Sequence, residues 1–306
     1  MVSIIEKDIK PKSANNNKIS IIFIISFCIL HNVLFVNNAE TKAWRQKGTG
    51  IFITSYEMRS FRGINSGFNY DNDIRYTQGV LNLYGEYGIT NRIAMIGKII
   101  AIDSMLMHGN WFLGKVNERS VGIDAIQMLT KIGIINNNEI IALFFITGLG
   151  TPSFYHQNKA SQFAIRKYSQ ISGIEFDLKI DKKSLLSLTA YYHYNIKHWY
   201  NELRLEAMYY RYFLKNLLFI VKFQKFIYQI HNKTEAQNDW QSANTSVYTF
   251  FANGGFAKIV FSFGTPISNN LMLEIGFYSS IKSKFLKTKS LDLKMRGIFL
   301  SLWYNF

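Results

Sequence analysis

The chain ends with the nine residues Ile-Phe-Leu-Ser-Leu-Trp-Tyr-Asn-Phe at positions 298–306. Ile298, Leu300, Leu302, Tyr304 and Phe306 occupy alternate positions, and a β-strand places alternate side chains on one face. A soluble protein seldom ends on so apolar a face, whereas a strand that contacts lipid and ends in an interfacial aromatic ring has this pattern. The segment therefore predicts the closing strand of a transmembrane β-barrel of the bacterial outer-membrane type.

The composition agrees with a barrel. Hydrophobic residues make up 48% of the chain and charged residues 18%, yet no run after residue 40 approaches the roughly 20 apolar residues of a spanning helix. Aromatic residues reach 16% and only 3 prolines occur, which suits interfacial aromatic girdles and hydrogen-bonded strands. We expect one all-β domain, an antiparallel up-and-down barrel.

Twelve segments alternate between apolar and polar residues, and bacterial single-chain barrels have an even number of strands. Short turns follow the even-numbered segments, and mostly longer polar connectors follow the odd-numbered ones, as expected for periplasmic turns and outer loops. A further strand pair within 148–170 or 231–254 would give fourteen strands, and a soluble β-sandwich is the rival all-β architecture. The predicted strands are 48–60, 74–87, 92–103, 121–134, 139–147, 171–180, 185–196, 200–213, 217–230, 255–264, 270–280 and 295–306.

The amino-terminal region has the features of a secretory signal. Four lysines precede the apolar stretch 19–36, and the small residues Ala39 and Ala43 follow it. We expect a signal peptide over 1–43, cleaved after Ala39 or Ala43, and a barrel over 44–306; the alternative is an uncleaved anchor helix. The single cysteine lies in the apolar stretch without a lipoprotein cleavage box, so the mature chain is expected to lack a thiol and a lipid anchor.

The net charge is strongly positive. Residues 1–39 hold four Lys against Glu6 and Asp8, so their removal lowers the net charge by two, from +15 to +13. Nucleic-acid binding is the usual expectation for such a charge, but the basic residues form no single stripe and most fall in predicted loops. We therefore expect no nucleic-acid partner, and instead anionic lipid head groups or a lumen that favours anions.

Several short motifs occur in a fixed order: residues 44–50 (WRQKGTG), 83–92 (LYGEYGITNR), 122–124 (GID), 150–152 (GTP), 201–206 (NELRLE) and 303–306 (WYNF). Their order resembles that of the outer-membrane barrels grouped under the MetA pathway of phenol degradation, over nearly the whole mature chain. The resemblance implies a transporter-like barrel whose terminal aromatic residue is read by the barrel-assembly machinery. The family name does not identify a cargo.

Strand parity separates lipid-facing from lumen-facing side chains. A lipid-facing Lys or Arg near the membrane midplane costs about 2 to 4 kcal/mol, so charged positions are assigned to the lumen, among them Lys98. These charges either select solutes by charge or form a neutralising network that fills a narrow barrel. The candidate lumen-facing binding residues are Glu175, Asp177, Lys179, His193, Glu202, Arg204, Glu206, Lys222, Lys258 and Glu274.

An enzymatic barrel is the less favoured alternative. A phospholipase-type site needs a Ser activated by an oriented His, and no histidine lies in a His-x-Ser-Asn-Gly sequence. Only His193 is assigned to the lumen, where hydrogen bonding is a simpler role than catalysis. We expect no cofactor and no metal, because the mature chain has no Cys and no His pair at ligand spacing.

The third functional class is a surface adhesin, an antigen or a closed scaffold. Four lysines cluster in the connector before the last strand, at 282, 284, 287 and 289. Such a cluster is either an ordinary solvated loop or a site for an anionic partner, for which lipopolysaccharide phosphates are the simplest choice. The favoured function remains a narrow channel or transporter for small solutes.

Overall fold

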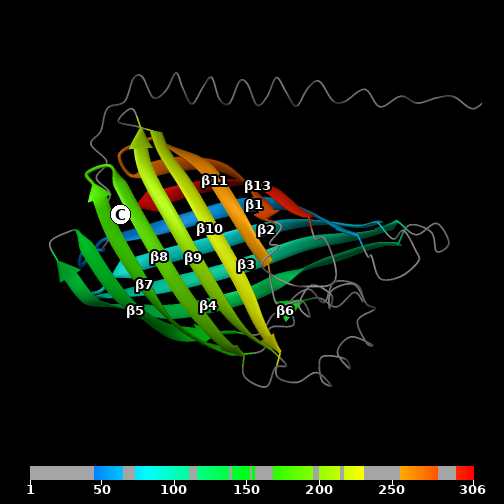
Figure 1. The fold of residues 1–306 in the computed structure, drawn as a ribbon, viewed down its shortest axis with the longest axis horizontal. Coiled ribbons are helices and arrows are strands. Elements are labelled where there is room, and N and C mark those ends of the chain that lie inside the picture. Colours follow the sequence, from blue (N-terminus) through cyan, green and yellow to red (C-terminus); the bar gives the residue numbers. More distant parts are fainter. Residues whose placement is uncertain are drawn as a thin grey trace, which may run out of the picture.

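The computed structural model describes residues 45–64, 73–109, 116–137, 140–151, 154–155, 168–195, 200–213, 217–230, 256–281 and 294–306. They form one antiparallel sheet (Figure 1). Its strands are β1 (Gly50–Ile64), β2 (Asp73–Gly88), β3 (Ile93–Gly109), β4 (Val116–Asn137), β5 (Ile141–Gly150), β6 (Phe154–Tyr155), β7 (Ser169–Asp181), β8 (Ser184–Asn195), β9 (Tyr200–Phe213), β10 (Leu217–Ile230), β11 (Phe256–Pro266), β12 (Leu271–Ile281) and β13 (Lys294–Asn305). In this described part of the chain, no helix is long and apolar enough to cross a membrane.

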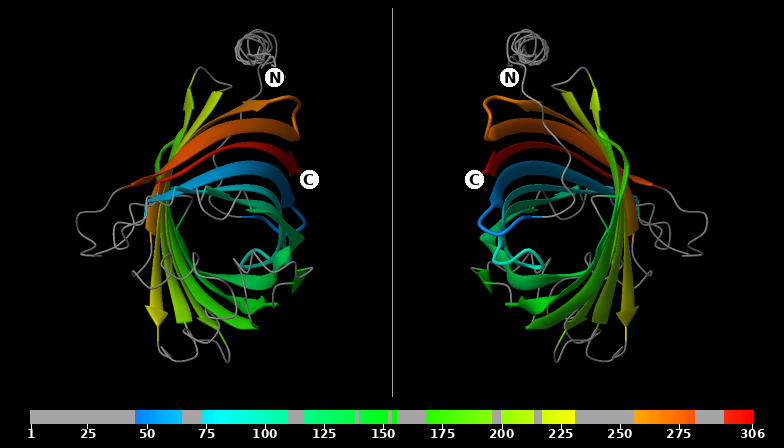
Figure 2. Two further views of the ribbon diagram at one scale, coloured as in Figure 1. Left: turned by 90° about the vertical axis from the view of Figure 1, so that its right-hand side faces the viewer. Right: turned by 90° about the vertical axis from the view of Figure 1, so that its left-hand side faces the viewer.

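The sheet closes on itself. Strand β1 pairs with β2 on one side and with β13 on the other, from Ile51 opposite Asn305 to Arg62 opposite Lys294. Figure 2 shows the red β13 beside the blue β1 and the sheet curving round to meet itself. Strand β6 pairs only with β4, beyond the point where β5 ends. The remaining strands form a twelve-stranded antiparallel barrel, as predicted, and not the fourteen-stranded alternative.

Five short connectors lie at one end of the barrel, and the four-residue connector 196–199 between β8 and β9 is the exception to this pattern. The five follow β2, β4, β7, β9 and β11, as the alternation of connector lengths predicts. In the turn after β7, the backbone N–H of Lys183 donates a 2.6 Å hydrogen bond to Asp181 Oδ1. Because short turns are periplasmic in such barrels, the beginning of β1 and the end of β13 lie at the periplasmic end.

Some strands extend further at the opposite end than the sequence predicts. Strand β1 continues to Ile64, β3 continues to Gly109, and β4 begins at Val116. A strand needs only about 9 to 11 residues to cross the hydrocarbon core. The backbone ladder between neighbouring strands continues beyond that length, so the predicted segments underestimate the strand length.

The outer surface of the barrel is apolar. On β13, Ile298 is 61% exposed and Leu300 is 50% exposed. Ser301, which follows Leu300 and points to the other face, is buried. The same alternation exposes Phe277 on β12 and Phe52 on β1. Exposed apolar side chains on a closed barrel form a lipid-contacting surface, and the predicted orientation of the last strand is confirmed.

The terminal residue belongs to the β1–β13 seam. Gly50 and Phe306 exchange two backbone hydrogen bonds, of 2.7 Å and 3.1 Å. The Phe306 ring stacks on Tyr87 and Tyr304, with centroid distances of 6.2 and 6.0 Å. A Cβ atom at Gly50 would overlap the Phe306 ring, so glycine allows this close packing at the periplasmic end of the seam.

Candidate functional site

One side of the barrel interior is filled by apolar side chains. They come from the neighbouring strands β3, β4, β5 and β7, and each is at most 4% exposed. Tyr84 from β2 and Tyr191 from β8 pack against them. We call this group the apolar wedge; it consists of Ile96, Leu129, Ile146 and Ile171.

Lys98 lies at the boundary of the apolar wedge. Its Nζ atom is 5.5 Å from the ring centroids of both Tyr84 and Tyr191. Tyr84 is on the strand next to β3, but Tyr191 is on β8, and β4, β5 and β7 lie between them in the sheet. The contact therefore joins side chains from β2, β3 and β8 across the interior, at the edge of the wedge against which both tyrosines pack.

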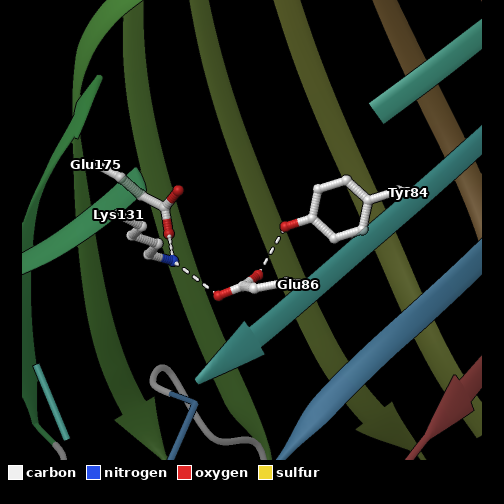
Figure 3. A network of polar contacts seen from close by, with 4 residues as sticks. All are labelled: Tyr84, Glu86, Lys131 and Glu175. Carbon is white, nitrogen blue, oxygen red and sulfur yellow. Dashed lines mark hydrogen bonds and ion pairs between the residues drawn. The ribbon is translucent and has the colours of Figure 1, made fainter. Parts of the chain in front are cut away.

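A polar network lies nearer the periplasmic end of the wedge side (Figure 3). The Tyr84 hydroxyl donates a 2.6 Å hydrogen bond to Glu86, and Lys131 Nζ lies 3.8 Å from Glu86 and 2.5 Å from Glu175. The ammonium group also lies 4.2 Å from the Phe144 ring centroid. One lysine from β4 thus links carboxylates from β2 and β7 and neutralises part of their charge, because buried charges are stable only when paired.

A second network lines β9 and β10. Arg204 donates two hydrogen bonds to one oxygen of Glu202, of 3.1 and 2.7 Å, through Nε and Nη2. Glu206 accepts a 2.7 Å hydrogen bond from Gln224 and lies 3.0 Å from the ammonium group of Lys222. Each carboxylate on this wall therefore has its own cationic partner.

Charged and aromatic groups also line β1, β11 and β12. Arg59 forms a 2.7 Å ion pair with Glu57. The Lys258 ammonium lies 4.7 Å from the Tyr278 ring centroid. Glu274 accepts hydrogen bonds from the Ser262 hydroxyl and, at 2.8 Å, from the Trp303 indole, so its charge is held by neutral donors.

The two sides of the interior differ in their access to water. The Lys131 side chain is 6% exposed, whereas Arg59, Arg204 and Lys222 are 24%, 21% and 27% exposed. These three cations lie on inward positions of β1, β9 and β10. Solvent therefore reaches the side lined by β1 and β9–β13, which we call the charged side, more than it reaches the Lys131 network.

The structure brings most of the candidate residues into these networks. His193 is 5% exposed, and its nearest residue on β9 in the ladder is Glu202. Asp177 is also buried and lies in electrostatic range of Lys131. Lys179 lies near the end of β7, where its backbone N–H donates to the Ile140 carbonyl.

The prediction of lumen residues from the sequence does not include several side chains that lie in the interior. Glu57, Arg59, Glu86 and Lys131 occupy inward positions, and strand parity, applied to their strands, would have found them. The sequence did not point to the inward-facing tyrosines, because aromatic residues were expected in the interfacial girdles and not in the lumen. Tyr84, Tyr191 and Tyr278 instead contact lumen cations.

Some predicted features lie outside the described residues. These are the signal peptide, the loop lysines 282–289 and the histidines at 156, 198 and 231, and they stay predictions. Within the described ranges, no group of three His, Cys, Asp or Glu side chains is arranged to hold a metal ion.

No protein-family profile matches the sequence, and no curated protein matches it. Among solved structures, the COG4313 outer membrane channel from Pseudomonas putida F1 has a TM-score of 0.59 and 10% identity, over 89% of this chain and 100% of that chain. The KdgM porin has a TM-score of 0.41 and 6% identity, over 82% and 99% of the two chains. A mutant of the monoaromatic hydrocarbon channel TodX has a TM-score of 0.48 and 5% identity, over 85% and 91%.

The likeness to the COG4313 channel is one of fold, at an identity too low to carry residue roles. A closed antiparallel sheet with an apolar outer surface and a charged interior satisfies the backbone inside lipid and leaves no open edge there. The protein is a bacterial outer-membrane β-barrel.

Proposed function

We propose that the protein is a narrow channel that passes small solutes across the outer membrane. The observation that carries this proposal is the partial exposure of inward-facing cations on the charged side. Arg204 and Lys222 are 21% and 27% exposed, as expected for side chains that border a water-filled path. A fully neutralised and filled interior would bury them as Lys131 is buried.

The apolar wedge fills one side of the interior, so the path is expected to lie off the barrel axis, on the opposite side. Because Lys98, Tyr84 and Tyr191 meet across the interior, a solute is expected to pass along the charged side. Twelve strands enclose less space than the 16 to 18 strands of open porins. Together these features favour a narrow path with a charged wall, whose proposed solute-contacting residues are the candidate residues of β9–β12.

Two finer assignments form part of the same proposal. The order of the sequence motifs supports membership of the MetA-pathway group of barrels, and the likeness to a solved outer-membrane channel agrees with a channel of that kind.

We also propose that the protein is not an enzyme. His193 is the only lumen histidine among the candidates, it is buried, and its register partner on β9 is Glu202, which supports a hydrogen-bonding role.

Two partners are proposed with the channel. The barrel-assembly machinery would bind the terminal strand that ends in Phe306. Lipopolysaccharide phosphates would bind the lysines at 282, 284, 287 and 289. Changing these four lysines to Gln should reduce the lipopolysaccharide that copurifies with the barrel, and unchanged lipid content would contradict this partner.

Single-channel recording in a planar bilayer tests the channel function. The protein purified from outer membranes should give stable conductance steps in KCl. Silence together with phospholipid hydrolysis would support an enzyme instead. Silence without hydrolysis would support an adhesin or a closed scaffold, in which the wedge and the charged networks only fill the barrel.

A further inference from the structure

We propose that Arg211 and the turn after β7 bind the head group of an anionic phospholipid in the periplasmic leaflet of the outer membrane. The site lies on the outer wall of the barrel, where β8, β9 and β10 are neighbouring strands (Figure 1). It is separate from the lumen, so the inference goes beyond the proposed channel function and does not depend on it. We call it the rim site; its residues are Lys182, Lys183, Tyr209, Arg211 and Phe213.

Arg211 is an outward-facing cation near the periplasmic end of β9. Arg204 and Glu206 point into the lumen, so the alternation of the strand turns Arg211 toward the membrane. Its side chain is exposed, and its register partners are Ser184 on β8 and Phe219 on β10. Because a charge that faces hydrocarbon is costly, the guanidinium group needs a polar partner at the membrane surface.

An aromatic belt places this guanidinium group at the depth of the lipid head groups. Its central carbon lies 5.5 Å from the ring centroid of Phe213. The Phe213 ring lies 6.1 Å from that of Phe219, which in turn lies 5.2 Å from that of Phe263. Phe213 and Phe263 are each 44% exposed. Such belts form at the boundary between head groups and hydrocarbon, so Arg211 lies where lipid phosphates lie.

A chain of hydrogen bonds orients the guanidinium group. Arg211 Nη1 donates to the Tyr209 hydroxyl at 3.4 Å, which donates to Ser184 Oγ at 3.5 Å. Ser184 Oγ donates to Asp181 Oδ2 at 3.2 Å. Within the part of the chain that the structure describes, no carboxylate lies within ion-pair distance of Arg211. Since guanidinium has five N–H donors in a planar fork, donors remain for a phosphate group, which arginine binds in a bidentate manner.

The charge around the guanidinium group is positive. Lys182 and Lys183 are exposed in the turn after β7, and the Tyr212 N–H donates a 2.9 Å hydrogen bond to the Lys183 carbonyl, so this turn is held beside the end of β9. The carboxylate of the turn, Asp181, already accepts hydrogen bonds from the Lys183 N–H and the Ser184 hydroxyl. The excess of cations favours an anionic head group over a zwitterionic one.

The wall next to the rim site suits acyl chains. Toward the membrane midplane, the outward side chains Leu188 and Leu205 are 41% and 37% exposed. Leu188 lies opposite the small residue Ala207 in the ladder. A phospholipid that places its phosphate on Arg211 therefore lays its chains on an apolar surface, whereas free phosphate gains no such contact.

Phosphatidylglycerol is the probe for the first experiment. Native mass spectrometry of the barrel released from detergent micelles should show saturable binding of phosphatidylglycerol and weaker binding of phosphatidylethanolamine. Arg211→Gln should raise the half-saturating phosphatidylglycerol concentration by about tenfold, as expected for loss of a hydrogen bond between charged groups. Tyr209→Phe, which removes the hydroxyl that orients the guanidinium group, should give a smaller increase.

The matched control is Lys225→Gln. Lys225 also faces outward, on the neighbouring strand β10, but it lies nearer the outer end, opposite Leu205 and Ala257. This variant should bind phosphatidylglycerol like the wild type. Equal losses in Arg211→Gln and Lys225→Gln would overturn the rim site, because any outward cation would then serve. Each variant must first show the heat-modifiable gel mobility of a folded barrel.

Two further outcomes test the class of ligand. Equal binding of phosphatidylethanolamine and phosphatidylglycerol would overturn the assignment to anionic lipids. Glycerol 1-phosphate, a head group without acyl chains, should not displace phosphatidylglycerol at equal concentration, and complete displacement would show a site for free phosphates instead. Conductance enters none of these measurements, so a silent barrel that binds the lipid would overturn the channel and keep the rim site.

Discussion

At the scale of single residues, Lys131 shows how one cation organises a buried carboxylate cluster. Its ammonium group contacts Glu175 and Glu86 and interacts electrostatically with Asp177. The side chain is almost fully buried, so water does not replace these contacts. Buried charges that lose their partner are costly, because the remaining charge is neither solvated nor neutralised.

Lys131→Met should therefore destabilise the barrel by about 3 to 5 kcal/mol at neutral pH. The loss should be smaller at pH 5. Without the ammonium group, the crowded carboxylates of the folded variant take up protons more readily than those of the unfolded chain, so the free energy of unfolding rises as the pH falls. Urea unfolding in detergent micelles, followed by tryptophan fluorescence, measures both values.

Lys182→Met is the control for Lys131→Met, because Lys182 is exposed in a turn. It should change the unfolding free energy little at either pH. A loss of stability in Lys131→Met that is the same at pH 5 and pH 8 would argue that packing of the lysine stem, and not its charge, holds the cluster.

At the scale of elements, β12 and β13 interlock through glycines opposite aromatic rings. Tyr278 on β12 lies opposite Gly297 on β13, and Phe299 on β13 lies opposite Gly276 on β12. A Cβ atom at either glycine would overlap the ring that covers it. The two strands thus exchange an aromatic ring in each direction on the inward face.

Gly297→Ala should lower the free energy of unfolding by about 1 to 3 kcal/mol, the usual cost of overpacking. The added methyl group meets the Tyr278 ring, which also covers Lys258. The control is Gly97→Ala on β3, where a Cβ atom would meet nothing within 4 Å. Equal thermal unfolding midpoints for the two variants would show that Tyr278 moves away at little cost.

The sequence predicts the elements well because the bilayer imposes a simple rule on them. Each of the twelve predicted segments overlaps a spanning strand, for example 200–213 with β9 and 217–230 with β10. The alternating pattern is required only where a strand contacts lipid. The predicted segments for β1, β3 and β4 are therefore too short at the outer end of the barrel. Strand β6 was not predicted, since a two-residue pairing leaves no periodic pattern.

At the scale of the whole molecule, parity predicts the direction of a side chain but not what it meets. It assigns Lys98 to the interior, yet it does not say that Tyr191 reaches Lys98 from β8. That contact depends on the curvature of the closed sheet and on side-chain length. The apolar wedge was unpredictable for the same reason, because Ile96 and Leu129 look like ordinary strand residues.

The closed barrel depends on the seam between its first and last strands, so deletion of Phe306 should lower the membrane-inserted fraction in cells. The deletion removes the hydrogen bonds to Gly50 and the stacking on Tyr87 and Tyr304. Heat-modifiable mobility of outer-membrane fractions measures the inserted barrel. Phe306→Tyr, which keeps the ring, should insert nearly as well as the wild type, and normal insertion of the deletion would contradict this role.

The same seam also sets the order of events during biogenesis. Ile51 pairs with Asn305, so the two edges that must meet come from opposite ends of the chain. The edge of β1 stays uncovered until the last strand has been delivered, however early the other hairpins form. Contacts between such distant residues are slow to form, and unpaired edges attract other chains. A chain that is truncated or stalled before β13 would therefore expose two unpaired strand edges, which can associate with other chains, during the slowest stage of its folding.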